Sequence, residues 1–190
     1  MKVLGINGSP RKKGNTEILL DEVMKGASSA GAEVKTIVLN KLKITACQHC
    51  DVCSKAGKCR IKDDMQQIYL ELEQSDRLVI ASPIQFLGPT AQMKAMIDRC
   101  QALWARKYVL KMPPLGDRRE RKGLFVSVGA LKMANLFEPS ITMVKALFTV
   151  LDVTYAGELV FRGIDEKGEI AKHPDALKKA YLAGKKLVED

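Results

Sequence analysis

Four of the five cysteines of this chain lie within thirteen residues, in the pattern Cys-x2-Cys-x2-Cys-x5-Cys. Three thiols at successive three-residue spacing can wrap one face of an iron–sulfur cubane, and a fourth thiol nearby can complete the set of ligands. Chance does not gather a rare residue in this way. The pattern therefore predicts a cluster-binding loop, whose ligands would be Cys47, Cys50, Cys53 and Cys59.

Other uses of these thiols stay open on the sequence alone. Tetrathiolate zinc usually joins two separate Cys-x2-Cys pairs, which this compressed run matches less well. A thiol site without a metal is the stronger alternative, and structural disulfides would need an oxidising compartment that nothing here indicates. His49 is a conceivable further ligand, although a single histidine in a polar loop is usually solvated. Cys100 falls on an apolar helix face, where we expect it in the core.

The second segment that could do chemistry is residues 7–16, NGSPRKKGNT, which follow a short apolar run. Its glycines allow the backbone to approach a ligand, and a following helix would present free N–H groups and a positive dipole. Ser9, Asn15 and Thr16 add polar groups, and Arg11 adds a charged donor that suits phosphate. The segment matches neither a Walker loop nor G-x-G-x-x-G. It predicts a site for a single phosphate; the alternative is a plain turn with a capping residue.

Apolar runs and turn residues predict the elements that position these groups. Strands are expected at residues 2–6, 34–39, 77–81, 122–128 and 153–160. Helices are expected from a cap at Asn15 or Thr16 to Gly31, and over residues 63–74, 89 to about 104, 139 to about 150 and 174–188. Residues 107–121 are basic and contain prolines, so we expect a loop there.

This alternation of strands and helices is typical of a parallel sheet with helices on both faces. Ligands of such sheets lie at the carboxyl ends of the strands. Residues 7–16, 82–90 and 127–137 all leave the carboxyl ends of predicted strands, so we expect them to converge on one site. The sequence contains no internal repeat or linker, which predicts one domain over residues 1–190.

The overall composition is that of an ordinary globular protein, with 46% apolar and 28% charged residues. No run approaches the roughly 18–20 apolar residues that span a bilayer, and the first residues do not resemble a signal peptide. We therefore expect a cytoplasmic protein without a membrane partner. The net charge of +9 includes clusters at 11–13, 118–122 and 185–186 but forms no single stripe, and aromatic residues are few. Nucleic-acid binding is therefore not expected.

Two segments carry a resemblance to a known family. GSPRKKGNT after the first strand and SPIQFLGPTAQMKAMIDR after the third resemble the NAD(P)H-dependent FMN reductase group of the flavodoxin-like superfamily. With the cysteine pattern, the chain resembles the iron–sulfur flavoprotein branch of that group. The resemblance implies a flavodoxin-like, doubly wound α/β fold with five parallel strands in the order 2-1-3-4-5. It also implies one FMN-binding domain, with a Cys-rich loop at about 41–62 inserted after the second strand.

The resemblance further implies which residues bind cofactors. The FMN phosphate would be bound by Ser9, Arg11, Asn15 and Thr16. The ring and ribityl chain would be contacted by two later loops, through Pro83, Ile84, Gln85, Phe86, Leu87 and Gly88 and through Ser127, Val128, Gly129 and Ala130. The family often has Tyr where this chain has Gln85, and Phe86 is the neighbouring aromatic residue. The four clustered cysteines would hold one [4Fe–4S] cluster.

These cofactors predict an oxidoreductase that links two-electron to one-electron transfer, because a flavin exchanges electrons in pairs or singly and a cluster passes one at a time. The donor would be a ferredoxin-like protein or NAD(P)H, and no catalytic general base is required. The resemblance implies a homo-oligomer, either a dimer or a tetramer. The alternative is an NAD(P)H-dependent FMN or quinone reductase without a cluster. A redox-sensing regulatory protein without flavin is the third class.

Overall fold

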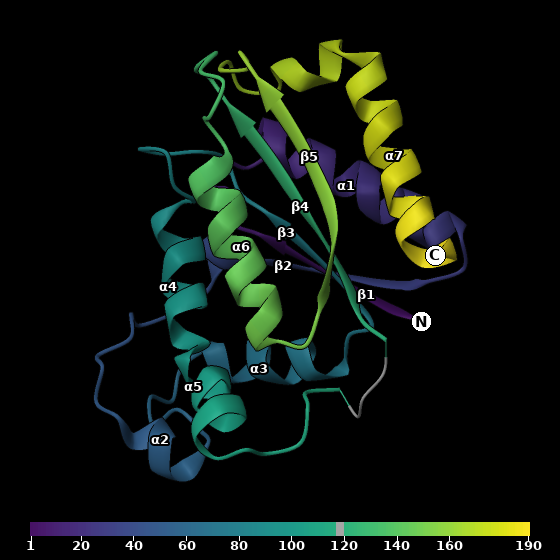
Figure 1. The fold of residues 1–190 in the computed structure, drawn as a ribbon. Coiled ribbons are helices and arrows are strands. Elements are labelled where there is room, and N and C mark those ends of the chain that lie inside the picture. The colour runs from purple at the N-terminus through teal and green to yellow at the C-terminus, as the bar shows by residue number, and fades with distance from the viewer. Residues whose placement is uncertain (117–119) are drawn as a thin grey trace.

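In the computed structural model, which describes residues 1–116 and 120–190, five parallel strands form a sheet of order β2-β1-β3-β4-β5 (Figure 1). The predicted order is confirmed, and the fold is flavodoxin-like. The strands are β1 (Lys2–Asn7), β2 (Glu33–Val38), β3 (Arg77–Ala81), β4 (Lys122–Gly129) and β5 (Thr154–Arg162).

The sheet divides the core into two layers, because successive side chains of a strand point to opposite faces. Leu4 of β1 and Leu78 of β3 belong to the apolar cluster on one face. Their neighbours Val3 and Val79 belong to the cluster on the other face. The central strands are thus buried on both sides, which explains their continuous apolar sequences.

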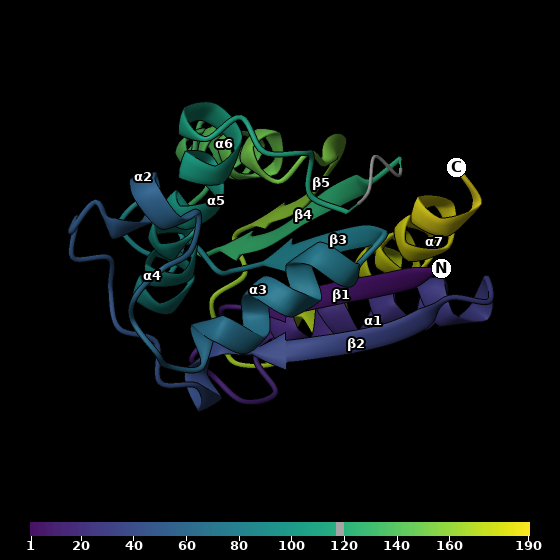
Figure 2. The ribbon, with the colours of Figure 1, turned by 90° about the horizontal axis from the view of Figure 1, so that it is seen from below.

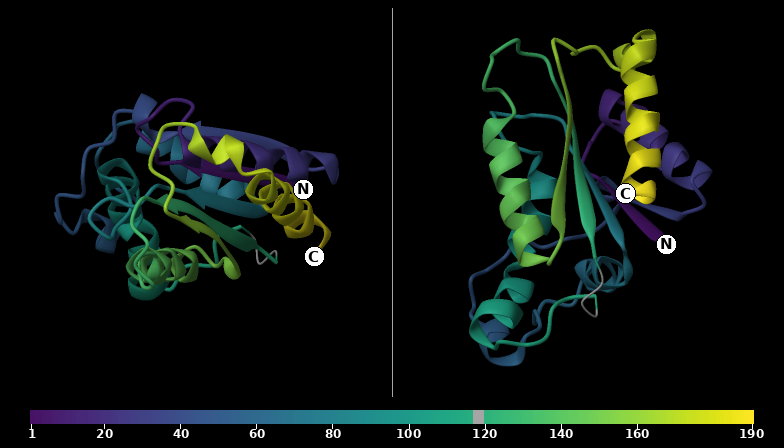
Figure 3. Two further views of the ribbon diagram at one scale, coloured as in Figure 1. Left: turned by 90° about the horizontal axis from the view of Figure 1, so that it is seen from above. Right: turned by 45° about the vertical axis from the view of Figure 1, so that its right-hand side comes forward.

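Helices cover both faces of the sheet (Figure 2; Figure 3). One face carries α1 (Asn15–Ser29) and α7 (Pro174–Glu189), which lie side by side. The other face carries α3 (Met65–Gln74), α4 (Ala91–Arg99) and α6 (Glu138–Val150), and α5 (Gln101–Trp104) continues from α4. The short α2 (Val52–Ala56) lies within the Cys-rich loop. Among the described residues, no helix is long and apolar enough to cross a membrane.

The start of α1 differs from the prediction. Gly14 is its N-cap, and no side chain caps the helix. The predicted caps are wrong because Asn15 directs both ends of its amide to the loop after β5, where it accepts from Ile170 N and donates to Glu166 O. The last strand, β5, extends to Arg162, beyond its predicted end at residue 160.

The helix predicted from residue 89 to about 104 is interrupted at Cys100. The N–H of Cys100 donates to Ile97 O (2.9 Å), three residues back, so α4 ends in a tighter turn before α5 begins. A π-helical turn over Ala105–Val109 follows, closed by Leu110 N donating to Ala105 O (3.0 Å). The prediction of a loop over residues 107–121 is therefore wrong for residues 107–109, which belong to this helical turn.

The remainder of that predicted loop is irregular where the structure describes it, and the consecutive prolines Pro113 and Pro114 prevent further helix. Residues 117–119 lie outside the described part of the chain. They include Arg118 and Arg119 of the basic cluster recognised in the sequence.

Candidate functional site

A polar cavity of about 180 Å³ lies at the carboxyl ends of the strands. The loops after β1, β3 and β4 line it, so the predicted convergence of three loops is confirmed, and the loop after β5 adds a fourth side. Ten of the residues expected to bind a cofactor line this cavity, namely Ser9, Arg11, Asn15, Thr16, Pro83, Ile84, Gln85, Val128, Gly129 and Ala130.

Hydrogen bonds within the loop after β1 hold it in a fixed curve. Asn7 Oδ1 accepts from Ser9 N (2.8 Å), and the Ser9 hydroxyl accepts from Arg11 N (3.3 Å). Ile18 N donates to Gly14 O (3.1 Å), so the preceding N–H groups of α1 have no intrahelical acceptor. A Cβ at Gly14 would lie 3.0 Å from Arg11 O, which is tighter than ordinary contact. The loop therefore forms a backbone cradle suited to an anion.

Two side chains add donors to this cradle. Thr16 is almost completely buried but borders the cavity, and its hydroxyl has no hydrogen-bond partner among the described residues. Arg11 is exposed, and its Nη1 donates to Asp165 O (3.2 Å), which leaves its other N–H groups available. A charged and a neutral donor thus border the cavity beside the helix N-terminus.

The loop after β5 is a part of the site that the sequence analysis did not include. Ile164, Asp165 and Lys167 of this loop line the cavity. Asn15 ties the loop to α1, since its Nδ2 donates to Glu166 O (2.8 Å). The same rule that selected the other three loops would have found it, because it also leaves the carboxyl end of a strand.

Hydroxyl groups fix the loop after β3 beneath the cavity. Ser127 Oγ donates to Ser82 O (2.7 Å), and Thr90 N donates to Ser82 Oγ (3.1 Å). Thr90 Oγ1 donates to Gly8 O (2.7 Å), which joins the start of α4 to the loop after β1. Ser127 is fully buried and lies outside the cavity lining, so its position supports the neighbouring loop.

A tight turn projects from the loop after β3. Gln85 and Gly88 exchange two backbone hydrogen bonds, and the residues between them, Phe86 and Leu87, have φ angles of 49° and 62°. Left-handed backbone at two successive non-glycine residues costs conformational energy. The turn leaves the ring of Phe86 fully exposed.

An apolar hollow of about 710 Å³ adjoins the polar cavity on this side. Phe86 and Leu87 line it together with Leu131, Met133 and Leu136, and Gly88 lines neither space. The two spaces share four lining residues, so they form one continuous site that is polar at one end and apolar at the other. The shared residues are Ile84, Gln85, Gly129 and Ala130.

The four clustered cysteines line a second, separate hollow of about 20 Å³. Cys47 and Cys50 are exposed, whereas Cys53 and Cys59 are half-buried. Burial raises the pKa of the Cys53 thiol above its ordinary value, and the other three cysteines of the hollow raise it further. In the described part of the chain, no three Cys, His, Asp or Glu side chains are arranged to hold a metal ion.

The middle of the Cys-rich loop has few internal contacts. Residues 46–50 take part in none of the hydrogen bonds found among the described residues. His49 and Asp51 have φ angles of 49° and 56°, and both side chains are exposed. A single short helix, α2, follows and is closed by Gly57 N donating to Cys53 O (2.8 Å).

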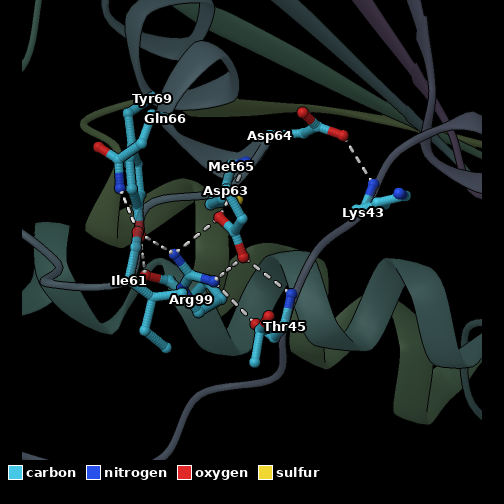
Figure 4. A network of polar contacts seen from close by, with 9 residues as sticks. All are labelled: Lys43, Thr45, Ile61, Asp63, Asp64, Met65, Gln66, Tyr69 and Arg99. Atoms are coloured by element: carbon cyan, nitrogen blue, oxygen red, sulfur yellow. Dashed lines mark hydrogen bonds and ion pairs between the residues drawn. The ribbon is translucent and has the colours of Figure 1, made fainter.

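The two ends of the Cys-rich loop are held by an ion pair between Arg99 and Asp63 (Figure 4). Asp63 Oδ2 accepts from Thr45 N (2.8 Å), and Oδ1 accepts from Met65 N (3.1 Å), at the start of α3. Burial acts to raise the pKa of Asp63, but the hydrogen bonds from Arg99, Thr45 and Met65 lower it below its ordinary value. The carboxylate therefore stays charged inside the protein.

Cys100 is a core residue, as predicted. Its side chain is buried in the apolar cluster under α4, and burial raises the pKa of its thiol to about 12 despite the nearby charge of Arg99. Cys100 is also absent from the hollow that the other four cysteines line.

One helix connects the two sites. At its start, the side chain of Thr90 contacts the loop after β1, and at its last residue, Arg99 contacts the Cys-rich loop. α4 runs between these contacts on one face of the sheet (Figure 1). The polar cavity and the cysteine hollow are thus at opposite ends of one rigid element.

Comparison with known proteins gives close relatives for part of the chain. An iron–sulfur flavoprotein of Archaeoglobus fulgidus is 45% identical over 106 residues, which are 56% of this chain and 54% of the relative. An iron–sulfur flavoprotein of Methanocaldococcus jannaschii is 38% identical over 103 residues, 54% of this chain and 53% of the relative. The chain thus spans about half the length of the curated relatives it matches.

Solved structures and a family model extend the comparison. An NAD(P)H:quinone oxidoreductase from Methanothermobacter marburgensis superposes with a TM-score of 0.76 at 16% identity, covering 98% of this chain and 96% of the other, which shows the shared fold. The family model described as NADPH-dependent FMN reductase matches residues 1–161. Because that match includes most of the sequence, the chain belongs to the NADPH-dependent FMN reductase family of oxidoreductases.

Proposed function

We propose that this protein binds FMN in the continuous polar and apolar site and a [4Fe–4S] cluster on its four clustered cysteines, and that it transfers electrons between a donor and an acceptor. The observation that carries the proposal is the presence of two distinct sites in one chain. One is shaped for a ligand with an anionic end and a flat end, and the other gathers four thiols.

The residues of the first site fit FMN. The loop after β1 would hold the phosphate through backbone N–H groups, Ser9, Arg11 and Thr16. The flat ring would extend past Ile84 and Gln85 into the apolar hollow, where Phe86 and Leu87 could cover it. Asn15 would act indirectly, because its amide already positions the loop after β5.

The residues of the second site suit an iron–sulfur cluster both in their chemistry and in their position. A [4Fe–4S] cluster takes one thiolate at each of four irons, so its thiols lie farther apart than ligands of a single ion. Cys47, Cys50, Cys53 and Cys59 line one hollow, and Arg99 borders it with positive charge. The names of the relatives, iron–sulfur flavoproteins, agree with this proposal.

When both cofactors are bound, FMN exchanges a hydride or single electrons and the cluster exchanges single electrons. The chain itself would bind and orient them and keep them at the two ends of α4. No side chain is required to abstract a proton. We propose NAD(P)H or a ferredoxin-like protein as the donor; the net charge of +9 would favour an acidic partner protein. The exposed apolar side chains around the apolar hollow beside the flavin site would favour assembly into a dimer or tetramer.

The second candidate is an NAD(P)H-dependent FMN or quinone reductase that lacks a cluster. It is favoured by the description of the matching family and by the missing three-ligand arrangement among the described residues. The two candidates share the flavin site and differ only at the cysteine hollow.

Purification without oxygen, followed by analysis of iron, sulfide and FMN, separates the candidates. The proposal expects about four iron, about four sulfide and one FMN per chain. FMN without iron or sulfide would refute the cluster and support the reductase. An absence of both cofactors would also refute the assignment of the phosphate loop.

A further inference from the structure

The last residue of α4, Arg99, has a charged side chain that is completely buried. It lies between the two ends of the Cys-rich loop (Figure 4). Burying a guanidinium is unfavourable unless its charge is paired and its N–H groups meet acceptors. The partner of each N–H group is therefore informative.

The two Nη atoms of Arg99 are fully used. Nη1 donates to Thr45 O (2.8 Å) and Asp63 Oδ2 (2.7 Å). Nη2 donates to Ile61 O (3.2 Å) and Asp63 Oδ1 (3.2 Å). These bonds hold Thr45, two residues before Cys47, and Ile61, two residues after Cys59, so the Nη groups fix both ends of the loop that carries the thiols.

The Nε–H group is different. It is buried and has no hydrogen-bond partner among the described residues. The nearby Tyr69 hydroxyl donates to the main-chain oxygen of Arg99 (2.7 Å). A buried donor without an acceptor is unfavourable and needs an explanation, and a bound ligand that supplies the acceptor is one such explanation.

The cysteine hollow is the place where such an acceptor would be bound, because Arg99 lines it together with the four clustered cysteines. Burial acts to lower the pKa of the Arg99 guanidinium, but Asp63, Tyr69 and the charge of Cys59 raise it above its ordinary value.

We infer that Arg99 sets the reduction potential of the cluster: its Nη groups position the Cys-rich loop, and its Nε–H donates to a sulfur atom held in the hollow. The inference rests on the proposed function, since it requires a cluster at the four cysteines. Arg99 would be a positioning and charge-compensating residue rather than a ligand.

The direction of the effect follows from charge. Reduction adds one negative charge to the cluster, and a buried guanidinium with an N–H directed to sulfur stabilises that charge. Asp63 offsets part of the positive charge but leaves the Nε–H donor in place. Arg99 therefore raises the potential, and its removal should make the cluster harder to reduce.

The test is a redox titration of the anaerobically purified holoprotein, in which the reduced cluster is followed by electron paramagnetic resonance. Arg99→Gln should shift the midpoint potential to more negative values, and Arg99→Lys, which keeps the charge, should shift it less. The flavin potential should not move in either variant. An unchanged cluster potential in a fully loaded Arg99→Gln protein would overturn the inference.

Arg121→Gln is the matched control. Arg121 is equally buried and also donates to backbone carbonyls, at Ser75 and Leu151, but it does not line the cysteine hollow. Its replacement should lower stability and leave the cluster potential unchanged. An equal potential shift in Arg121→Gln would show a general effect of destabilisation and would refute the specific role of Arg99.

A measurement on the unmodified sequence keeps the inference testable if Arg99→Gln fails to assemble a cluster. Protein labelled with ¹⁵N at arginine Nε should show a ¹⁵N coupling to the reduced cluster in pulsed electron paramagnetic resonance, and its absence would overturn the hydrogen bond. Failure of the proposed function is distinguishable, because the unmodified protein would then contain no iron or sulfide.

Discussion

The loop after β1 and the Cys-rich loop follow adjacent strands but are built in opposite ways. In the first, Asn7, Ser9 and Gly14 form hydrogen bonds that fix the backbone before any ligand arrives. In the second, Arg99 and Asp63 hold only the ends, and residues 46–50 have no hydrogen bond among the described residues.

This difference indicates how each site acquires its ligand. A preorganised cradle binds without a large loss of conformational entropy. A loop held only at its ends needs the ligand to complete its structure, as structural metal sites commonly do. We therefore expect the phosphate cradle to exist without FMN, and the thiols to take their final arrangement with the cluster.

The largest expected effect is at the thiols. Cys50→Ala should reduce the iron content from about four per chain to nearly none, because a compact cluster depends on its full set of thiolates. FMN content should stay unchanged, since its site lies at the other end of α4. Cys100→Ala is the control, because Cys100 is buried outside the hollow, and it should retain both cofactors. Full iron content in Cys50→Ala would contradict the assignment of Cys50.

The next effect concerns the Arg99–Asp63 ion pair, which holds the two ends of the Cys-rich loop. Asp63→Ala leaves Arg99 buried without a counter-charge and should lower the free energy of unfolding by about 3–5 kcal/mol, measured by urea denaturation. Asp98→Ala removes an exposed ion pair with Lys94 and should cost only about 0.3–0.5 kcal/mol. Similar losses in the two variants would show that the buried pair does not hold the loop.

The same pair predicts a pH dependence. The folded-state pKa of Asp63 lies below its ordinary value, so its contribution is present above the unfolded pKa of about 3.9 and is lost as pH falls through the folded pKa. The stability difference between the unmodified protein and Asp63→Ala should therefore be constant above about pH 5 and shrink in acid. A difference that persisted undiminished to about pH 2 would contradict this linkage.

A smaller effect is expected in the phosphate cradle. Thr16→Val removes one hydroxyl without a change of shape and should weaken FMN binding by about 10- to 100-fold, the usual value of a hydrogen bond to a charged group. Quenching of FMN fluorescence by the flavin-free protein measures this affinity. Thr149→Val on the exposed side of α6 is the control and should bind normally. An unchanged affinity in Thr16→Val would remove Thr16 from the proposed phosphate ligands.

The smallest effect compares the two loops directly. Lys13 and Asp51 both have left-handed backbone, with φ angles of 54° and 56°. Lys13→Gly should stabilise the protein by up to about 1 kcal/mol, because glycine adopts this conformation without strain. Asp51→Gly should raise the stability of the cluster-free protein by less, because the loop around Asp51 is less constrained there. Equal gains in thermal denaturation would show that the Cys-rich loop is as ordered as the cradle.

Much of the fold could be predicted from local patterns. The third strand, residues 77–81, matches β3 at both ends, and the three predicted loops meet at the cavity. These features depend on apolar runs and on a general rule for parallel sheets. The thiol cluster was equally visible, because its four members are close in sequence.

Features that depend on distant contacts could not be predicted. The side chain of Asn15 could cap a helix or bind phosphate. Its amide group instead forms hydrogen bonds with residues 166 and 170, which only the folded chain brings near. The Arg99–Asp63 pair joins residues 36 apart and has no sequence signature. The interruption at Cys100 was hidden because the apolar spacing continues across it into α5.

The contacts at the two ends of α4 restrict how this protein can vary in evolution. Each residue added to a helix turns everything beyond it by about 100° and moves it by about 1.5 Å. A one-residue insertion between Thr90 and Arg99 would therefore swing the guanidinium away from Thr45 and Ile61 while the hydroxyl stayed at Gly8. Homologues that keep both contacts should tolerate substitutions along α4 but neither insertions nor deletions.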